Sequence, residues 1–153
     1  MKSKFFVAVI NVLVLCLIIF FVSLYFIYNS WLIGFVIFGL GILCLLSLLP
    51  FKIAVSSIWP DIIFGLIDNG ILAILAIFGG EIAGTVGAVI GGVVGNSLTD
   101  GIAGIFEGFM AEKMKKKNVV ENRTMLGSSV GKMAGCLLGA GVVLIIASLI
   151  KFV

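Results

Sequence analysis

The sequence contains no histidine and very few charged residues. Charged side chains make up 11% of its 153 residues, and hydrophobic ones make up 62%. Soluble domains carry about 25% charged and about 45–50% apolar residues. This shortage of charge excludes a soluble globular domain and predicts a protein whose solvent is lipid. The absence of histidine also removes the commonest general base and the commonest ligand of transition metals.

Cysteine is scarce as well, and its three positions carry no motif. Cys16, Cys44 and Cys136 lie inside apolar segments, and an odd number without regular spacing argues against a disulfide framework or a metal-thiolate site. Lys132 precedes Cys136 by one helical turn and could activate the thiol, but small buried cysteines are the favoured interpretation. No phosphate-binding loop is present, and the net charge of +3 does not suggest a nucleic-acid partner. We therefore expect no enzymatic activity and no bound cofactor.

Five apolar segments are long enough to cross a bilayer, which predicts an all-α bundle of about five transmembrane helices. They cover residues 5–28, 31–54, 60–78, 83–110 and 125–150. We expect Gly79-Gly80 to break the chain between the third and fourth segments, and Pro60 to lie in the first turn of the third. The first segment is too long for a cleavable signal peptide and is expected to be retained.

The basic residues outside the segments indicate an orientation. With five crossings and a cytoplasmic N-terminus, one side receives Lys2, Lys4, Lys52, Lys113, Lys115, Lys116, Lys117 and Arg123, and only Lys151 falls on the other. The cluster at 113–117 would anchor this topology and also contact anionic lipid. We therefore expect an integral protein of the cell (cytoplasmic) membrane.

The chain divides into two parts of different character. Residues 1–55 form two apolar N-terminal membrane helices rich in Leu, Ile and Phe. Residues 56–153 form a glycine-rich core of three membrane helices, which holds most of the intramembrane charge. A functional site is therefore expected in the second part.

Glycine recurs at every fourth position in the fourth and fifth segments. The two rows are Gly87, Gly91 and Gly95, and Gly127, Gly131, Gly135 and Gly139. Rows of this kind let helix backbones approach closely, which is how helices associate in lipid. They predict glycine-zipper packing of the C-terminal helices, either inside the chain or between the subunits of a homo-oligomer such as a dimer.

Acidic and amide side chains form a second face on the fourth segment. Asn96, Asp100 and Glu107 are separated by four and seven residues, so they fall within about 40° of one another on a helix, roughly opposite the glycine row. A charge near the bilayer centre costs several kcal/mol. This face is therefore expected to meet another polar surface or water.

The third segment supplies polar partners at a similar depth, and the fifth supplies one cation. The expected metal ligands are oxygen donors, which suit divalent cations: Asp68, Asn69, Asn96, Asp100 and Glu107, with Lys132 as the ion-pair partner. One interpretation is a polar cluster that holds three helices in register, in which Lys132 pairs with one acid and burial keeps another protonated. The other is a cation path, which the excess of acid over base favours.

The stretch "DIIFGLIDNGILAILAIFGG", followed by "GAVIGGVVGNSLTDGIAGIFEGFMAEK", resembles the first two membrane helices of the vacuolar iron transporter family. Asp68, with Gly70 close behind, matches the aspartate that lines the family's ion path, and Glu107 matches its second-helix glutamate loosely. The resemblance implies proton-coupled export of iron or manganese from the cytoplasm by a dimer. Asn69 interrupts the family's Asp-Gly pair, its glutamate-rich insert is missing, and two apolar segments precede the matching part.

Two functions follow as hypotheses. The first is a transporter or channel-like protein for a divalent metal cation of the iron or manganese type, coupled to protons. The second is a membrane scaffold or subunit that transports nothing, whose glycine-zipper helices mediate assembly.

Overall fold

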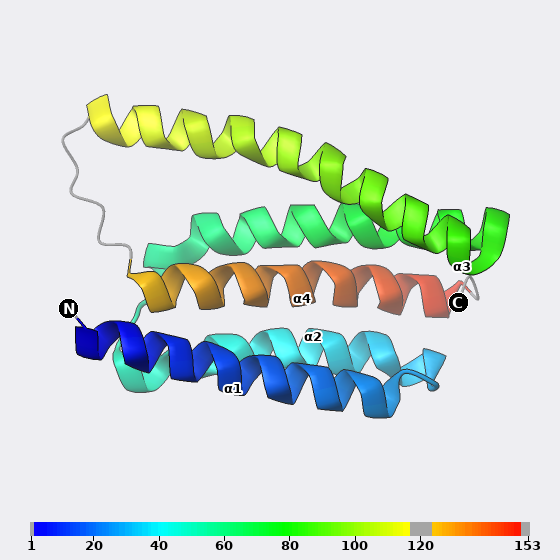
Figure 1. Ribbon diagram of the computed structural model, residues 1–153, viewed down its shortest axis with the longest axis horizontal. Coiled ribbons are helices and arrows are strands. Elements are labelled where there is room, and N and C mark those ends of the chain that lie inside the picture. Colours follow the sequence, from blue (N-terminus) through cyan, green and yellow to red (C-terminus); the bar gives the residue numbers. More distant parts are fainter. Residues whose placement is uncertain (1, 117–123, 151–153) are drawn as a thin grey trace.

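The computed structural model describes residues 2–116 and 124–150, and this part of the chain is entirely helical (Figure 1). Its elements are α1 (Lys2–Phe26), α2 (Ser30–Leu46), the short 3-10 helix η1 (Leu49–Phe51), α3 (Val55–Lys116) and α4 (Met125–Leu149). Four helices are long and apolar enough to cross a membrane, and they cover Lys4–Phe26, Trp31–Phe51, Val55–Phe106 and Met125–Leu149. Their length and composition indicate a membrane protein.

The helix α3 reverses direction in its middle, at Ala83 and Gly84. Gly84 has φ 59° and ψ −142°, a backbone conformation that glycine adopts far more readily than residues with a Cβ. The expected break at Gly79-Gly80 is therefore wrong by four residues. Both of these glycines are helical, and Gly79 packs against the returning chain. We call residues 55–82 the first arm of α3 and residues 85–116 its second arm.

The start of α3 also differs from the expectation. The helix begins at Val55, so Pro60 lies inside it rather than at its first position. The hydroxyl of Ser57 donates a hydrogen bond of 2.7 Å to the carbonyl oxygen of Ala54 just before the first turn. The first arm is therefore one turn longer than the apolar segment alone indicates.

The helix α4 lies between α2 and the first arm of α3, while the second arm lies farther from it (Figure 1). A Cβ built on Gly141 would come within 2.7 Å of the backbone nitrogen of Phe38 on α2. On the opposite side of α4, a Cβ on Gly135 would overlap the carbonyl oxygen of Ile62, and one on Gly139 would overlap that of Leu66. This central helix therefore joins the N-terminal helices to the rest of the chain.

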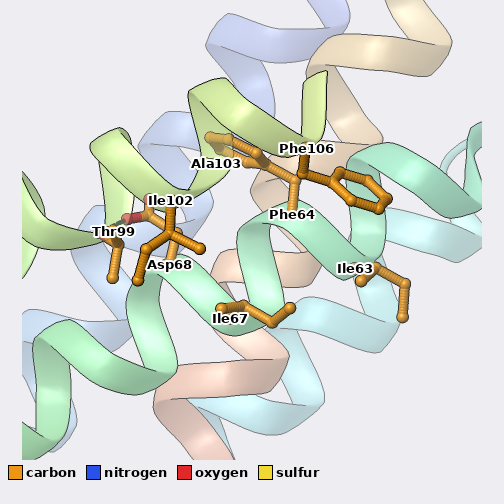
Figure 2. A pocket seen from close by; sticks show the side chains of 8 residues that line it. All are labelled: Ile63, Phe64, Ile67, Asp68, Thr99, Ile102, Ala103 and Phe106. Atoms are coloured by element: carbon orange, nitrogen blue, oxygen red, sulfur yellow. Dashed lines mark hydrogen bonds between the residues drawn. The ribbon is translucent and has the colours of Figure 1, made fainter. Parts of the chain in front are cut away.

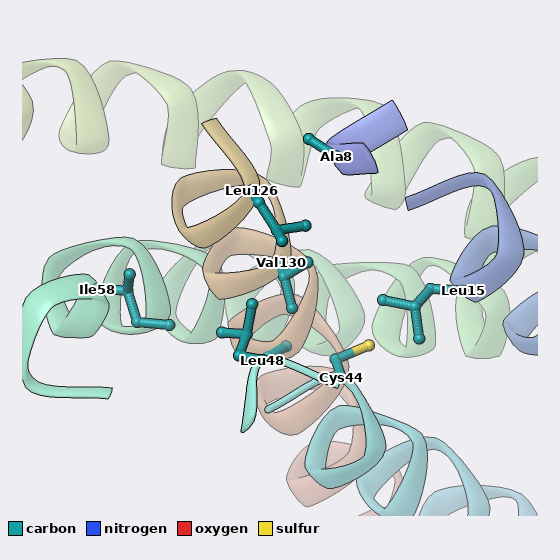
Figure 3. Close-up of a cluster of buried hydrophobic side chains, with 8 residues drawn as sticks. Ala8, Leu15, Cys44, Leu48, Ile58, Leu126 and Val130 are labelled. Carbon is teal, nitrogen blue, oxygen red and sulfur yellow. The ribbon is translucent and has the colours of Figure 1, made fainter. Parts of the chain in front are cut away.

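A cluster of buried apolar side chains lies where α1, the C-terminal end of α2 and the N-terminal halves of α3 and α4 meet (Figure 3). Its members are Ala8, Leu15, Cys44, Leu48, Ile58, Leu126, Val130 and Ala134. Cys44 is fully buried there, whereas Cys136 is partly buried and Cys16 is exposed, so the expectation of small buried cysteines is confirmed for Cys44 and wrong for Cys16.

The first glycine row lies between the two arms of α3. A Cβ on Gly87 would overlap the carbonyl oxygen of Gly79, and one on Gly91 would overlap that of Leu75. One turn further, a Cβ on Gly95 would come within 2.9 Å of the Cα of Leu72. Both glycine rows thus lie at helix contacts inside a single chain.

Candidate functional site

The side chains of Asp68 and Thr99 meet between the two arms of α3. The hydroxyl of Thr99 lies within hydrogen-bonding distance of Asp68 Oδ1, and Thr99 is only 1% exposed. The same hydroxyl lies 3.0 Å from the carbonyl oxygen of Gly95. A hydroxyl has a single proton, so donation to the carboxylate excludes donation to the backbone.

This pair lies near the middle of both arms. At 1.5 Å per helical residue, Asp68 is about 20 Å from Val55 and about 24 Å from Gly84. At the same rise, the first arm is about 42 Å long and the second about 48 Å, so each is long enough to cross a hydrocarbon core of about 30 Å. In an upright arrangement, Asp68 and Thr99 therefore lie where a carboxylate is most costly.

A cavity of about 110 Å³ opens beside this pair (Figure 2). Its lining consists of Ile63, Phe64, Ile67 and Asp68 from the first arm, and Thr99, Ile102, Ala103 and Phe106 from the second. Each set follows the spacing of three and four residues that places side chains on one face of a helix. Asp68 and Thr99 are its only polar lining residues. The volume exceeds that of a single water molecule, and the walls of the cavity are almost entirely apolar.

Asn96 and Asp100 lie on another face of the second arm and do not line this cavity. Both are exposed, and the Asn96 amide donates a hydrogen bond of 2.9 Å to Asp100 Oδ2. The expectation that they would meet Asp68 at one interior site is therefore wrong for the single chain. The glycine row packs against the first arm, and Thr99 continues that row by one turn. The polar face, which lies roughly opposite the glycines, consequently turns away from Asp68.

Asn69 and Lys132 lie at the contact between the first arm and α4. The Lys132 ammonium lies 4.4 Å from the centre of the Phe64 ring, within the range of a cation–π interaction. Asn69 follows Gly65 by one helical turn, and a Cβ on Gly65 would overlap the backbone of Lys132 on α4. Asn69 therefore lies on the side of the first arm that faces α4, and Lys132 lies on the side of α4 that faces the first arm, whereas Asp68 faces the second arm. Glu107 belongs to α3, but its side chain lies outside the described part of the structure.

The sequence analysis missed a buried carboxylate, Asp61, at the same contact. It is 1% exposed, and the hydroxyl of Ser128 donates a hydrogen bond of 3.0 Å to its Oδ1. Asp61, Gly65 and Asn69 follow one another at intervals of four residues, so a helical projection of the first arm would have placed them on one face. With Pro60 in the first turn, Asp61 would lie at the beginning of the helix, whereas the helix in fact begins at Val55 and Asp61 lies inside it.

Within residues 2–116 and 124–150, no group of three or more His, Cys, Asp or Glu side chains is placed to hold a metal ion. Asp68 with Thr99 and Asn96 with Asp100 instead form two separate polar pairs. Comparisons with protein-family models, with curated proteins and with solved structures found no match to this chain.

Proposed function

We propose that this chain is an integral membrane protein that moves a divalent metal cation of the iron or manganese type, coupled to protons, with Asp68 as the residue that binds the ion. The observation that carries the proposal is the position of the Asp68 carboxylate. It lies in mid-span, it accepts a hydrogen bond from Thr99, and it adjoins a cavity between the arms. Intramembrane acids of this kind mark ion and proton pathways.

The chemistry of the pair fits alternate binding of a metal ion and a proton. Asp68 and Thr99 offer oxygen ligands, which hard divalent cations prefer. Ca²⁺ and Mg²⁺, for example, complete their coordination with further oxygens, including those of water. The cavity that Asp68 helps to line has room for molecules the size of water. Proton coupling requires that the metal ion and a proton bind this carboxyl group in turn, as intramembrane acids do in pumps and transporters.

The proposed topology has five crossings, since the two arms of α3 cross the bilayer separately. The N-terminus then lies in the cytoplasm, where the basic residues gather. Both ends of the pair of arms lie on this side, and the reversal at Gly84 lies on the other. The proposal includes no enzymatic step and no resident cofactor.

Flux measurements in proteoliposomes test the proposal. Vesicles that hold a Mn²⁺-sensitive dye and a pH dye should report Mn²⁺ entry coupled to proton exit for the wild-type chain. Asp68→Asn should abolish both signals, because it removes the charge while keeping the size of the side chain. Asp100→Asn is the matched control, since Asp100 does not line the cavity. Wild-type flux in Asp68→Asn would refute the assignment.

The second candidate function is assembly without transport, as a scaffold or a subunit of a homo-oligomer. The observation in its favour is the exposed Asn96–Asp100 pair on the second arm, because polar side chains join helices in membranes. Oligomers that form while wild-type vesicles show no Mn²⁺ or proton flux would favour this function over the first.

A further inference from the structure

The second arm of α3 carries another row of small and polar residues, which the chain itself leaves uncovered. The outer row, as we call it, consists of Gly92, Asn96, Asp100, Gly104 and Gly108. A Cβ built on any of its three glycines would find no atom within 4 Å. Its spacing of four residues is the same as that of the inner row, Gly87, Gly91 and Gly95, which lies against the first arm.

Lipid is a poor cover for the outer row. Asn96 and Asp100 lie on either side of Thr99, whose partner Asp68 is near mid-span, so both lie deep in the bilayer. A carboxylate exposed to hydrocarbon at this depth costs several kcal/mol. One hydrogen bond from Asn96 leaves the other lone pairs of Asp100 and the second N–H of the amide unused in the described contacts.

A second copy of the chain complements this surface. Asn96 supplies N–H donors, and Asp100 supplies acceptors one helical turn away. Each chain therefore presents both a donor and an acceptor to a second copy. The contact in a two-fold dimer is self-complementary, with the same surface used by both subunits. Glycines above and below the polar pair allow the close approach that helix association in lipid requires.

We infer that the outer row is the interface of a parallel homodimer, in which the Asn96 amide of one subunit bonds the Asp100 carboxyl of its partner across a two-fold axis. The glycine rows at 87–95 and 127–139 are excluded as the interface, since both are occupied inside the chain. This inference deepens the assembly proposal and does not depend on cation movement.

Cysteine cross-linking in native membranes tests the interface. In a background with Cys16→Ala, Cys44→Ala and Cys136→Ala, mild oxidation should link Gly104→Cys into a species of twice the monomer mass. Leu98→Cys is the matched control: it is 54% exposed and lies between Asn96 and Asp100 in the sequence, but it points about 160° away from each. Cross-linking of Leu98→Cys and not of Gly104→Cys would overturn the inference, and so would a product with the mass of a different protein.

A second measurement relates the interface to affinity. Gly104→Leu adds bulk to the outer row at a position that is open in the monomer, so the single chain should still fold. We expect the dimer dissociation constant, measured by subunit counting in lipid vesicles, to rise by about tenfold, which corresponds to about 1.4 kcal/mol. Gly39→Leu, at another open glycine on α2, should leave it unchanged. Asp100→Asn should preserve the dimer, because the amide oxygen can still accept the hydrogen bond from the partner's Asn96.

A dissociation constant for Gly104→Leu equal to that of the wild type would overturn the interface, whatever the flux measurements show. Loss of flux in Asp68→Asn with an intact dimer would support the cation proposal separately. The two proposals therefore fail by different results.

Discussion

The hydrogen bond between Thr99 and Asp68 allows the sharpest test of the fold, by Thr99→Val. Valine keeps the shape of threonine and removes the hydroxyl, so the cavity changes little while Asp68 loses its donor. A hydrogen bond to a charged group contributes about 1.5–3 kcal/mol, and one between neutral groups about 0.5–1.5 kcal/mol. Measured hydrogen bonds between transmembrane helices average about 0.6 kcal/mol, with a maximum of about 1.7 kcal/mol. We therefore expect Thr99→Val to destabilise the protein by about 1–2 kcal/mol.

The assay is a double-mutant cycle that combines Thr99→Val with Asp68→Asn, with the free energy of unfolding measured in detergent micelles. A cycle isolates the interaction between two side chains from the separate effects of each change. If the hydroxyl acts through the carboxylate, the two changes together should cost less than the sum of the single changes. Thr85→Val is the matched control, since Thr85 is exposed at the beginning of the second arm.

A coupling free energy indistinguishable from zero would show that the Thr99 hydroxyl does not act through the Asp68 carboxylate. Thr99 would then act through the backbone carbonyl oxygens of Gly95 and Asn96, which lie 3.0 Å and 3.1 Å from its hydroxyl. Equal destabilisation by Thr85→Val and Thr99→Val would also contradict an interaction with Asp68, because only Thr99 contacts the opposite arm.

Two further changes test the contact between α3 and α4. Gly135→Ala should destabilise the protein by about 1–3 kcal/mol, the usual cost of overpacking, because the new Cβ would overlap the carbonyl oxygen of Ile62. Gly39→Ala is the control in the same unfolding assay and should be nearly neutral, since a Cβ there has open space. Ser128→Ala should destabilise the protein by about 1–3 kcal/mol, because it removes a hydrogen-bond donor from the buried Asp61 carboxylate. Ser129 is exposed, so Ser129→Ala should have little effect. Equal effects of the two changes would exclude this role for the Ser128 hydroxyl.

The membrane class and the helices follow from the sequence because they depend on local composition. Long apolar runs with almost no charge leave few alternatives to helices in lipid. The position of the reversal in α3 does not follow as easily. Gly79-Gly80 is the stronger local signal for a break, but Gly79 is needed inside the helix for its contact with Gly87. The reversal falls instead at Gly84, where the glycine supplies a positive φ.

The arrangement of the polar residues depends on which helix packs against the glycine row at 87–95. The sequence alone does not show which helix this is. The projection of the second arm correctly separates the glycine face from the face of Asn96 and Asp100. The prediction that Asp68 meets Asn96 and Asp100 also assumes that the first arm packs against the polar face of the second arm. The first arm in fact lies on the glycine side, and Thr99 extends that side by one turn. A threonine in a row of glycines is the signal that would have identified the partner of Asp68.

The two sets of glycines on the second arm separate folding from assembly. The inner row brings the arms of α3 together, because even a methyl group on Gly87 would overlap the backbone opposite. A Cβ on any glycine of the outer row would meet no atom within 4 Å, so no close contact inside the described chain requires these glycines. Selection for folding alone would therefore allow larger residues at Gly92, Gly104 and Gly108, and helix propensity would favour them, since glycine costs about 1 kcal/mol relative to alanine in a helix. The presence of three glycines where they only weaken the single helix is best explained by a surface that becomes buried when two chains meet.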